Sequence, residues 1–184
     1  MTITDTPIDN GVNVEALLGA KGALTETPAA AAFTWRARCE WIRGTHARTE
    51  VQDFSGLGQD HERSGHAIET DHPEIFASEN NGMTPPETVL AGLAGCLTAG
   101  VASVATHRGI QLHSVSASIE GDMDLQGILG IDPDVRNGFG RITVRFDIDA
   151  DATDAEIAAL VAQSQKRSAV YDLITNPTTV VVSA

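Results

Sequence analysis

Cys96 is the residue best suited to chemistry in this sequence of 184 residues. It lies near the middle of the run TVLAGLAGCLTAGVASVAT, residues 88–106, which contains no charged side chain. A thiol among small apolar residues is either an inert core residue or a nucleophile held in a dry pocket. The assignment of a function depends on which of these two descriptions is correct.

A nucleophilic Cys96 would need a group that keeps its thiol ionised, because burial among apolar groups raises the pKa of a thiol. Cys96 lies eleven residues beyond Pro85, where its predicted helix starts, and the effect of a helix dipole fades within the first turn. His107 shares the face of Cys96 but lies about 16 Å along the helix, which excludes a Cys–His pair. We therefore expect a cation from another element, such as an arginine.

Cys39 is the only other cysteine, and it is predicted to be a small buried hydrophobic residue. In the strand-like run FTWRARCEWI, residues 33–42, it alternates onto the same face as Trp35 and Trp41. Two cysteines do not form a disulfide framework, so a reducing cytoplasm is expected. The six histidines show no ligand spacing, and neither a metal nor a cofactor is expected.

The composition restricts the classes of partner. The net charge is −13 without a basic block, which argues against binding to nucleic acid or to an anionic membrane. The N-terminus has no pattern of a secretory signal. The run 88–106 is long enough to span a bilayer, but its three Gly, five Ala and four Ser/Thr favour a buried central helix.

The helix that carries Cys96 has clear start and stop signals. Thr84, Pro85 and Glu87 have the spacing of a capping box with proline at the first helical position. His107 and Arg108 suit the last turn, and Gly109 suits the residue after the helix. A helix from about Pro85 to His107 is predicted.

The other elements indicate an α+β fold of antiparallel sheet, one buried helix and one amphipathic helix. Residues 1–12 are expected to be loose, and residues 55–65 to form a loop. One domain, residues 31–184, is expected after an N-terminal extension, residues 1–30, that contains a short helix. The predicted strands are 33–42, 45–54, 66–71, 115–125, 141–149 and 178–183, and the further helices cover 13–24 and the segment after a second capping box at Thr153 and Glu156.

The order of these motifs resembles the OsmC/Ohr family, whose members include many hydroperoxide reductases. TPPETVLAGLAGC, residues 84–96, is similar to the family's Asn-Pro-Glu run that leads into the helix of the reactive cysteine. Similarity extends over roughly residues 13–184. The other matching segments are VSASIEGDMDLQGILGIDPDVRNGF at 115–139, RITVRFDI at 141–148 and QKRSAVYDLITNPTTVVV at 165–182.

The resemblance implies antiparallel sheets packed around a long buried central helix in an intertwined homodimer, with two sites at the subunit interface. In peroxidases of the family, a first cysteine attacks the peroxide, and an arginine held by a glutamate stabilises its thiolate. A second cysteine then forms a disulfide, which dihydrolipoyl-type thiols reduce. Cys96 matches the first cysteine.

The sequence departs from the family pattern at two of these positions. Ser168 stands at the expected place of the second cysteine, and a hydroxyl cannot form a disulfide. The family's glutamate would align with Pro86, whereas the carboxylate here is one residue later, at Glu87, and can be only the acid of the capping box. For the arginine the candidates are Arg48 and Arg43, and Arg48 is favoured.

The first hypothesis for function is a one-cysteine, thiol-dependent peroxidase of oxidative-stress defence. Cys96 would reduce organic hydroperoxides or H₂O₂ through a sulfenic acid, with Arg48 and Glu87 in the site and an external thiol as reductant. The alternative is a protein that binds a small apolar ligand, in which Cys96 only lines the interface pocket. Cysteine-based acyl transfer would need a base that the sequence does not place.

Overall fold

The computed structural model describes residues 8–184, which form two compact units. One unit comprises residues 8–12 and 89–184, and the other comprises residues 13–88. The first seven residues of the segment predicted to be loose lie outside the described residues. The boundary expected at residue 30 stays a prediction.

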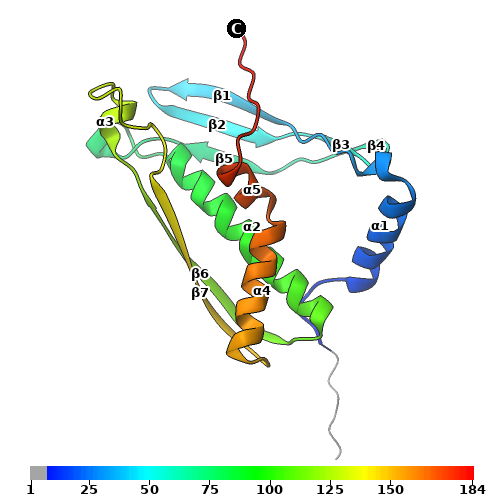
Figure 1. Ribbon diagram of the computed structural model, residues 1–184. Coiled ribbons are helices and arrows are strands. Elements are labelled where there is room, and N and C mark those ends of the chain that lie inside the picture. The colour runs from blue at the N-terminus through cyan, green and yellow to red at the C-terminus, as the bar shows by residue number, and fades with distance from the viewer. Residues whose placement is uncertain (1–7) are drawn as a thin grey trace, which may run out of the picture. The chain divides into compact units, whose positions relative to one another are not determined.

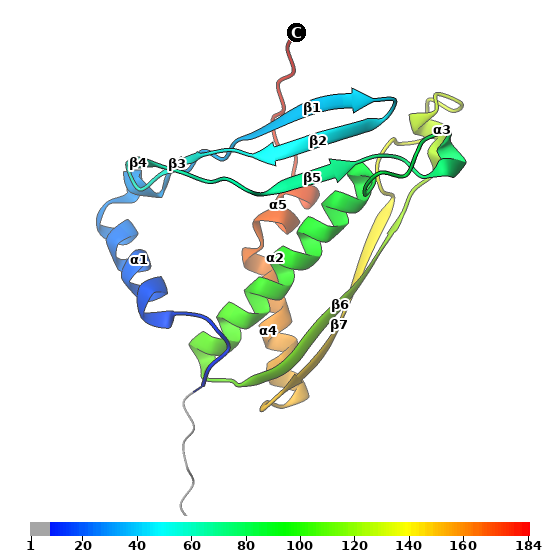
Figure 2. The ribbon, with the colours of Figure 1, turned by 180° about the vertical axis from the view of Figure 1, so that it is seen from behind.

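A three-stranded antiparallel sheet forms the centre of the unit 13–88 (Figure 2). Its strands are β1 (Ala37–Arg43), β2 (His46–Val51) and β5 (Ala67–Thr70), in the order β1-β2-β5. Gly44 has a φ of 55° in the turn that joins β1 to β2, where glycine avoids strain. The predicted hairpin and the predicted third strand are therefore confirmed.

The prediction that Cys39 lies in the core is wrong. All of β1 is exposed, Cys39 included, and Trp35 and Trp41 keep 64% and 72% of their surface exposed. Alternation in a sequence identifies the apolar face of a strand, but burial needs another layer to cover that face. No part of the described chain, residues 8–184, buries this face of β1.

A second short hairpin lies where a loop was expected. It consists of β3 (Phe54–Gly56) and β4 (Gln59–His61). Its two turn residues, Leu57 and Gly58, both have positive φ, as the tight turns of two-residue hairpins require. The rings of Phe54 and His61 stack across it at 4.6 Å. This cross-strand aromatic pair stabilises a hairpin whose polar, glycine-containing sequence has weak strand propensity.

The other elements of this unit are helical. The predicted short helix is confirmed as α1 (Val14–Glu26), and Asn13 caps it by accepting a hydrogen bond from the backbone N–H of Ala16. Two 3₁₀ turns, η1 (Pro28–Ala31) and η2 (Glu74–Phe76), interrupt the connections.

The long helix α2 (Pro85–Arg108) begins and ends as its sequence predicts. Thr84 and Glu87 exchange hydrogen bonds at its start, and Gly109 has a φ of 72° after its end. Only one stripe is buried, so the helix is less covered than the prediction of a buried central helix implied. By length and composition it could cross a membrane, although core helices of soluble proteins pass the same test. The buried stripe consists of Leu93, Leu97, Val101 and Ala105.

The second unit contains a long antiparallel hairpin of β6 (Leu112–Asp122) and β7 (Arg141–Ala150) (Figure 1). Residues along β6 alternate between partly buried and exposed, as the sequence predicts for a sheet with one covered face. A short helix, α3 (Leu125–Ile128), lies in the connection between the two strands.

Two further helices complete this unit. α4 (Asp154–Arg167) starts with the predicted capping box of Thr153 and Glu156, and α5 (Ala169–Thr175) follows after Ser168. α4 contacts α2 closely at Gly100, where the hydroxyl of buried Ser164 donates to the carbonyl of Leu97 at 2.6 Å. The small core of this unit consists of Ala105, Ile110 and Leu160, with Val104, Leu112, Ala150 and Ala152 packed against it.

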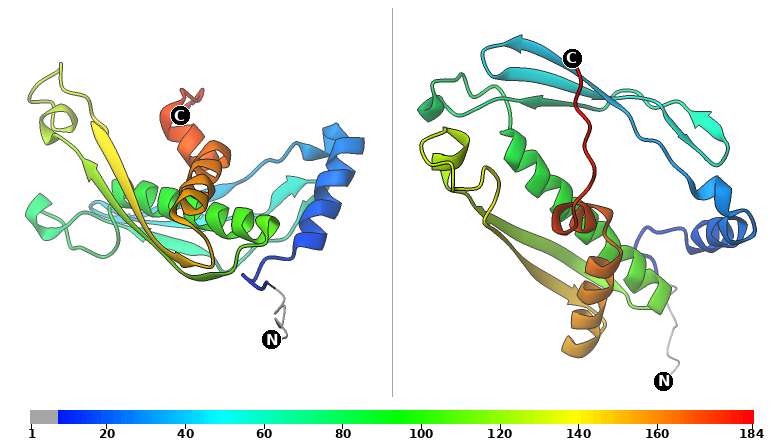
Figure 3. Two further views of the ribbon diagram at one scale, coloured as in Figure 1. Left: turned by 60° about the horizontal axis from the view of Figure 1, so that its bottom comes forward. Right: turned by 45° about the horizontal axis from the view of Figure 1, so that its top comes forward.

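The C-terminal segment does not form the predicted strand 178–183. Residues 177–184 have no regular structure, and Val180, Val181 and Val182 are largely exposed. Figure 3 shows this segment leaving α5 without joining the β6–β7 hairpin. The run of β-branched residues has the propensity of a strand, but a strand forms only where another strand pairs with it.

Candidate functional site

Cys96 lies on α2 beside the start of α5 and is half-buried. The hydroxyl of Ser168 donates a hydrogen bond to its Sγ over 3.1 Å, although the two residues are 72 positions apart in the sequence. The backbone N–H groups of Ala169 and Val170, next in the chain, also lower the pKa of this thiol. One short segment therefore supplies both the hydroxyl that is hydrogen-bonded to the thiol and the backbone groups that lower its pKa.

The groups around Cys96 shift the pKa of its thiol. Burial raises its pKa, but the Ser168 hydroxyl and the backbone N–H groups of Val170 and Ala169 together outweigh burial and lower the pKa below the usual value of a cysteine. A neutral thiol is a weak acceptor, whereas a thiolate accepts several hydrogen bonds well. The arrangement favours the reactive, ionised form of Cys96.

The sequence argument for an external cation did not include these groups, and the cation stays a prediction. It considered only the dipole of α2, whose start is indeed too distant. The donors come from the first turn of α5, which was not predicted. The sequence does contain a signal for the start of α5, because Ser168 is of a type favoured at the N-cap and directly precedes AVYDLIT. In the structure its Oγ accepts a hydrogen bond from the backbone N–H of Tyr171.

Arg48, the favoured arginine, lies in β2 of the other unit and has its own acidic partners there. Its guanidinium pairs with Glu69 of β5 and Glu50 of β2. The hydrogen bonds that Arg48 donates to these acids, the one to Glu69 first, raise the pKa of Arg48 above its ordinary value. His46 and Arg48 in turn lower the pKa of Glu69. Arg48 is thus a fixed cation, and its role toward Cys96 stays a prediction.

The second arginine candidate, Arg43, pairs with a different acid. Its guanidinium lies 2.8 Å from the carboxylate of Glu79, and both side chains are exposed. Neither candidate pairs with Glu87 within residues 8–184. The acids that pair with these two arginines, Glu50, Glu69 and Glu79, were not identified from the sequence, because the strand pairing and the loop that place them were not predicted in detail.

Glu87 is engaged at the start of α2. Its Oε2 accepts hydrogen bonds from the backbone N–H of Thr84 at 2.7 Å and from the Thr84 hydroxyl at 2.9 Å. These bonds lower the pKa of Glu87, the backbone bond having the larger effect. The geometry is that of a capping box, which is the structural role considered for this residue.

Metal-binding geometry is not found in the part of the chain that the structure describes. No three His, Cys, Asp or Glu side chains within residues 8–184 come together as metal ligands would. Two histidines are instead paired with single acids, His46 with Glu69 and His113 with Asp151.

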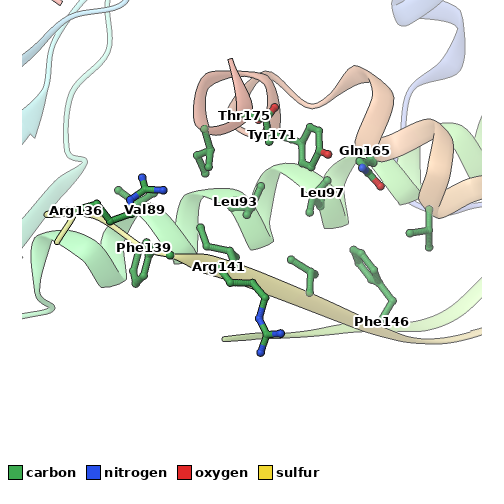
Figure 4. A pocket seen from close by; sticks show the side chains of 15 residues that line it. Val89, Leu93, Leu97, Arg136, Phe139, Arg141, Phe146, Gln165, Tyr171 and Thr175 are labelled. Atoms are coloured by element: carbon green, nitrogen blue, oxygen red, sulfur yellow. The ribbon is translucent and has the colours of Figure 1, made fainter. Parts of the chain in front are cut away.

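A cavity of about 550 Å³ lies within the unit that contains Cys96. Figure 4 shows Leu93 and Leu97 of α2 between Tyr171 of α5 and Phe146 of β7. Cys96 does not line this cavity, although Leu97 directly follows it in the chain. The full set of lining residues is Val89, Leu93, Leu97, Arg136, Phe139, Gly140, Arg141, Ile142, Val144, Phe146, Val161, Gln165, Tyr171, Ile174 and Thr175.

Solved structures with the same fold include proteins of low sequence identity. An organic hydroperoxide resistance protein OsmC from Legionella pneumophila is 20% identical with a TM-score of 0.58, over 79% of this chain and 92% of that one. An OsmC-like protein from Mycoplasma pneumoniae is 16% identical with a TM-score of 0.61, over 78% and 88% of the two chains. At these identities the likeness establishes the fold alone.

Sequence comparison gives the family. Among curated proteins, none has a sequence that matches this chain significantly. The family model of OsmC-like proteins, however, matches residues 78–183, which is more than half of the chain. This stretch contains Cys96, Ser168 and all elements from α2 to α5. The chain therefore belongs to the OsmC-like protein family.

Proposed function

We propose that the protein is a one-cysteine, thiol-dependent peroxidase that reduces organic hydroperoxides or H₂O₂ at Cys96. The observation that carries this proposal is the hydrogen bond from the buried Ser168 hydroxyl to the half-buried sulfur, next to backbone N–H groups that also lower its pKa. An inert core cysteine needs no such donors. The names of related structures, which include organic hydroperoxide resistance proteins, support the same substrate class.

In the proposed reaction, the Cys96 thiolate attacks one oxygen of the peroxide. An S–O bond forms, the O–O bond breaks, and the departing alkoxide takes a proton from solvent to leave as an alcohol. The sulfur is oxidised by two electrons to a sulfenic acid while the peroxide is reduced. The donors at Sγ raise the fraction of thiolate available at neutral pH.

Regeneration requires a thiol from outside the chain. Ser168 faces the sulfur and cannot form a disulfide with it. An external thiol would displace water from the sulfenic acid to give a mixed disulfide, and a second thiol would release the Cys96 thiolate and a new disulfide. We propose a small cytoplasmic thiol as this reductant.

The experiment is a stoichiometric titration of the reduced protein with cumene hydroperoxide, followed by dimedone trapping and mass spectrometry. A Cys39→Ser background leaves Cys96 as the single thiol, and Cys96→Ser is the matched blank. The proposal expects one adduct on Cys96 at near-equimolar peroxide. Unmodified Cys96 under these conditions would exclude it.

Arg48 is proposed as the cation that assists the reaction, as the family resemblance implies. Arg48→Met is expected to slow formation of the sulfenic acid, whereas Arg43→Met, which removes a more exposed arginine that is also paired with an acid, is expected to leave the rate unchanged. Stopped-flow rates for both variants measure the difference. Equal rates in Arg48→Met and the parent would remove Arg48 from the site.

A second candidate function is the binding of a small apolar ligand. The observation that favours it is the cavity of about 550 Å³, whose walls are mainly aliphatic and aromatic and do not include Cys96. Native mass spectrometry of the purified protein would detect a retained ligand. In that case Val144→Trp, which fills the cavity, is expected to abolish binding, and Cys96→Ser is expected to keep it.

A further inference from the structure

We infer that Ser168 is a positioning residue that directs its hydroxyl proton onto the sulfur of Cys96 and so holds this cysteine ready to react. The inference rests on the proposed function and adds a specific role for the residue that replaces a second thiol. The geometry of Ser168 carries it: the side chain is 5% exposed, and its Oγ lies 3.1 Å from Cys96 Sγ.

The orientation of the hydroxyl follows from its other bond. The backbone N–H of Tyr171 donates to Oγ of Ser168 at 3.1 Å and occupies one of its acceptor sites. The hydroxyl proton must then point elsewhere, and the sulfur of Cys96 is the acceptor within reach. Because Ser168 is buried, water does not compete for this proton to any large extent.

The cap hydroxyls at the starts of α2 and α4 show why the hydroxyl proton of Ser168 is available to another acceptor. Thr84 and Thr153 each donate their hydroxyl to the glutamate three residues later, Glu87 and Glu156, which completes a capping box. At Ser168 the third residue is Tyr171, which has no carboxylate near the cap. The local sequence S-x-x-Y thus forms a cap but leaves the hydroxyl donor for a partner outside the helix.

The same contact has a consequence after the reaction with peroxide. A second thiol at this position would attack the sulfenic acid, form an S–S bond and release water. The Ser168 hydroxyl does not undergo that step and can continue to donate a hydrogen bond to the oxidised group. The sulfenic acid is therefore expected to persist until an external thiol reaches it.

The first test measures the ionisation of Cys96 by thiolate absorbance against pH in the Cys39→Ser background. Ser168→Ala is expected to raise the pKa of Cys96 and to lower the rate of oxidation at neutral pH by about tenfold, the effect of losing one hydrogen bond to a charged group. Ser168→Thr keeps the hydroxyl and is expected to behave like the parent.

Two matched controls separate this role from capping. Thr153→Ala removes a cap hydroxyl of the same unit that does not touch Cys96, and is expected to leave its pKa unchanged. Tyr171→Gln supplies a side-chain acceptor at the capping-box position and is expected to raise the pKa of Cys96 while the helix cap is kept. Tyr171→Phe, with the backbone and ring retained, is the control for that variant.

A final variant, Ser168→Cys, tests the geometry directly. Equimolar peroxide is expected to convert it to an internal disulfide, with loss of two hydrogen atoms and no dimedone adduct. An unchanged pKa of Cys96 in both Ser168→Ala and Tyr171→Gln would overturn the inference. The pKa measurements do not depend on peroxidase activity. If the parent protein does not react with peroxide but the variants show the expected pKa changes, only the proposed function is excluded.

Discussion

Single side chains in this protein are fixed by hydrogen bonds from distant parts of the chain. Asp71 shows this in the unit 13–88, where it is only 1% exposed. Its carboxylate accepts from the hydroxyls of Thr45 and Ser78, from the backbone N–H of His72 and from both nitrogens of Asn81. These bonds, those from the two hydroxyls first, hold the pKa of Asp71 far below its usual range.

The first prediction concerns the pH dependence of stability through Asp71. Folding lowers the pKa of Asp71, so its ionised carboxylate adds to the free energy of unfolding. This contribution is fully present above the unfolded-state pKa of about 3.9 and is lost as the pH falls below that pKa. Asp71→Asn is expected to unfold at lower urea concentration at pH 7, and the difference from the parent is expected to narrow below about pH 4.

Urea denaturation followed by circular dichroism at several pH values measures this effect. Asp147→Asn, at an exposed position of β7, is the matched control and is expected to change little at any pH. A difference for Asp71→Asn that stays constant down to pH 3 would contradict the assignment.

At the scale of elements, α2 depends on close packing against α4. A Cβ atom added at Gly100 would collide with Oγ of Ser164 and lie near its Cβ, whereas one added at Gly95 would meet nothing. Ser164 is itself bonded to the carbonyl of Leu97 and cannot move away freely. Gly100 therefore has no room for a larger side chain, whereas Gly95 on the same helix does.

The second prediction uses this contrast. Gly100→Ala is expected to destabilise the protein by about 1–3 kcal/mol, the cost of overpacking a close contact. Gly95→Ala is expected to be neutral or stabilising by up to about 1 kcal/mol, because alanine favours the helix. Thermal unfolding of the two variants measures both changes in stability. Equal changes in stability would show that α2 and α4 do not approach closely at Gly100.

The third prediction separates capping from catalysis at the start of α2. Thr84→Ala and Glu87→Ala each remove part of one capping box and are expected to cost roughly 1 kcal/mol of stability. Both are expected to oxidise at Cys96 at the parental rate. If Glu87→Ala alone slowed the reaction with peroxide, the carboxylate would have a role in the site beyond its cap.

At the scale of the whole molecule, large apolar side chains remain exposed on β1 and in the C-terminal segment. Trp41 and residues 180–182 are among the most exposed of them. Exposed apolar surface of this kind marks association sites, and an unpaired β-branched segment can pair with another strand. We propose that a second copy of the chain covers these groups, in agreement with the dimer that the family resemblance implies.

The fourth prediction is the mass in solution. Light scattering after gel filtration is expected to give twice the chain mass of 19.3 kDa. Trp41→Glu is expected to shift the protein toward a monomer, while Trp41→Phe keeps an apolar ring and is expected to remain dimeric. A monomeric parent at micromolar concentration would contradict the proposed dimer.

Predictions from the sequence succeeded where a structural signal lies within a few neighbouring residues. The bounds of α2, both capping boxes and the alternation along β6 and β7 were predicted correctly. Errors arose where a partner was needed. Cys39 and the segment 178–183 have the pattern of buried or paired strands, but burial and pairing depend on what covers or adjoins a strand.

The sequence alone thus determined the helix that carries Cys96, the absence of a second thiol at Ser168 and the strands β1, β2, β5, β6 and β7, because caps, turns and alternation are local. Only the tertiary structure determined the hydrogen-bond partner of that cysteine. The donor, Ser168, lies 72 residues further along the chain, and the direction of a hydroxyl proton depends on which acceptors surround it in space. Local sequence patterns cannot predict such contacts, because each polar group can form several different hydrogen bonds and the packing of the chain decides which one it forms.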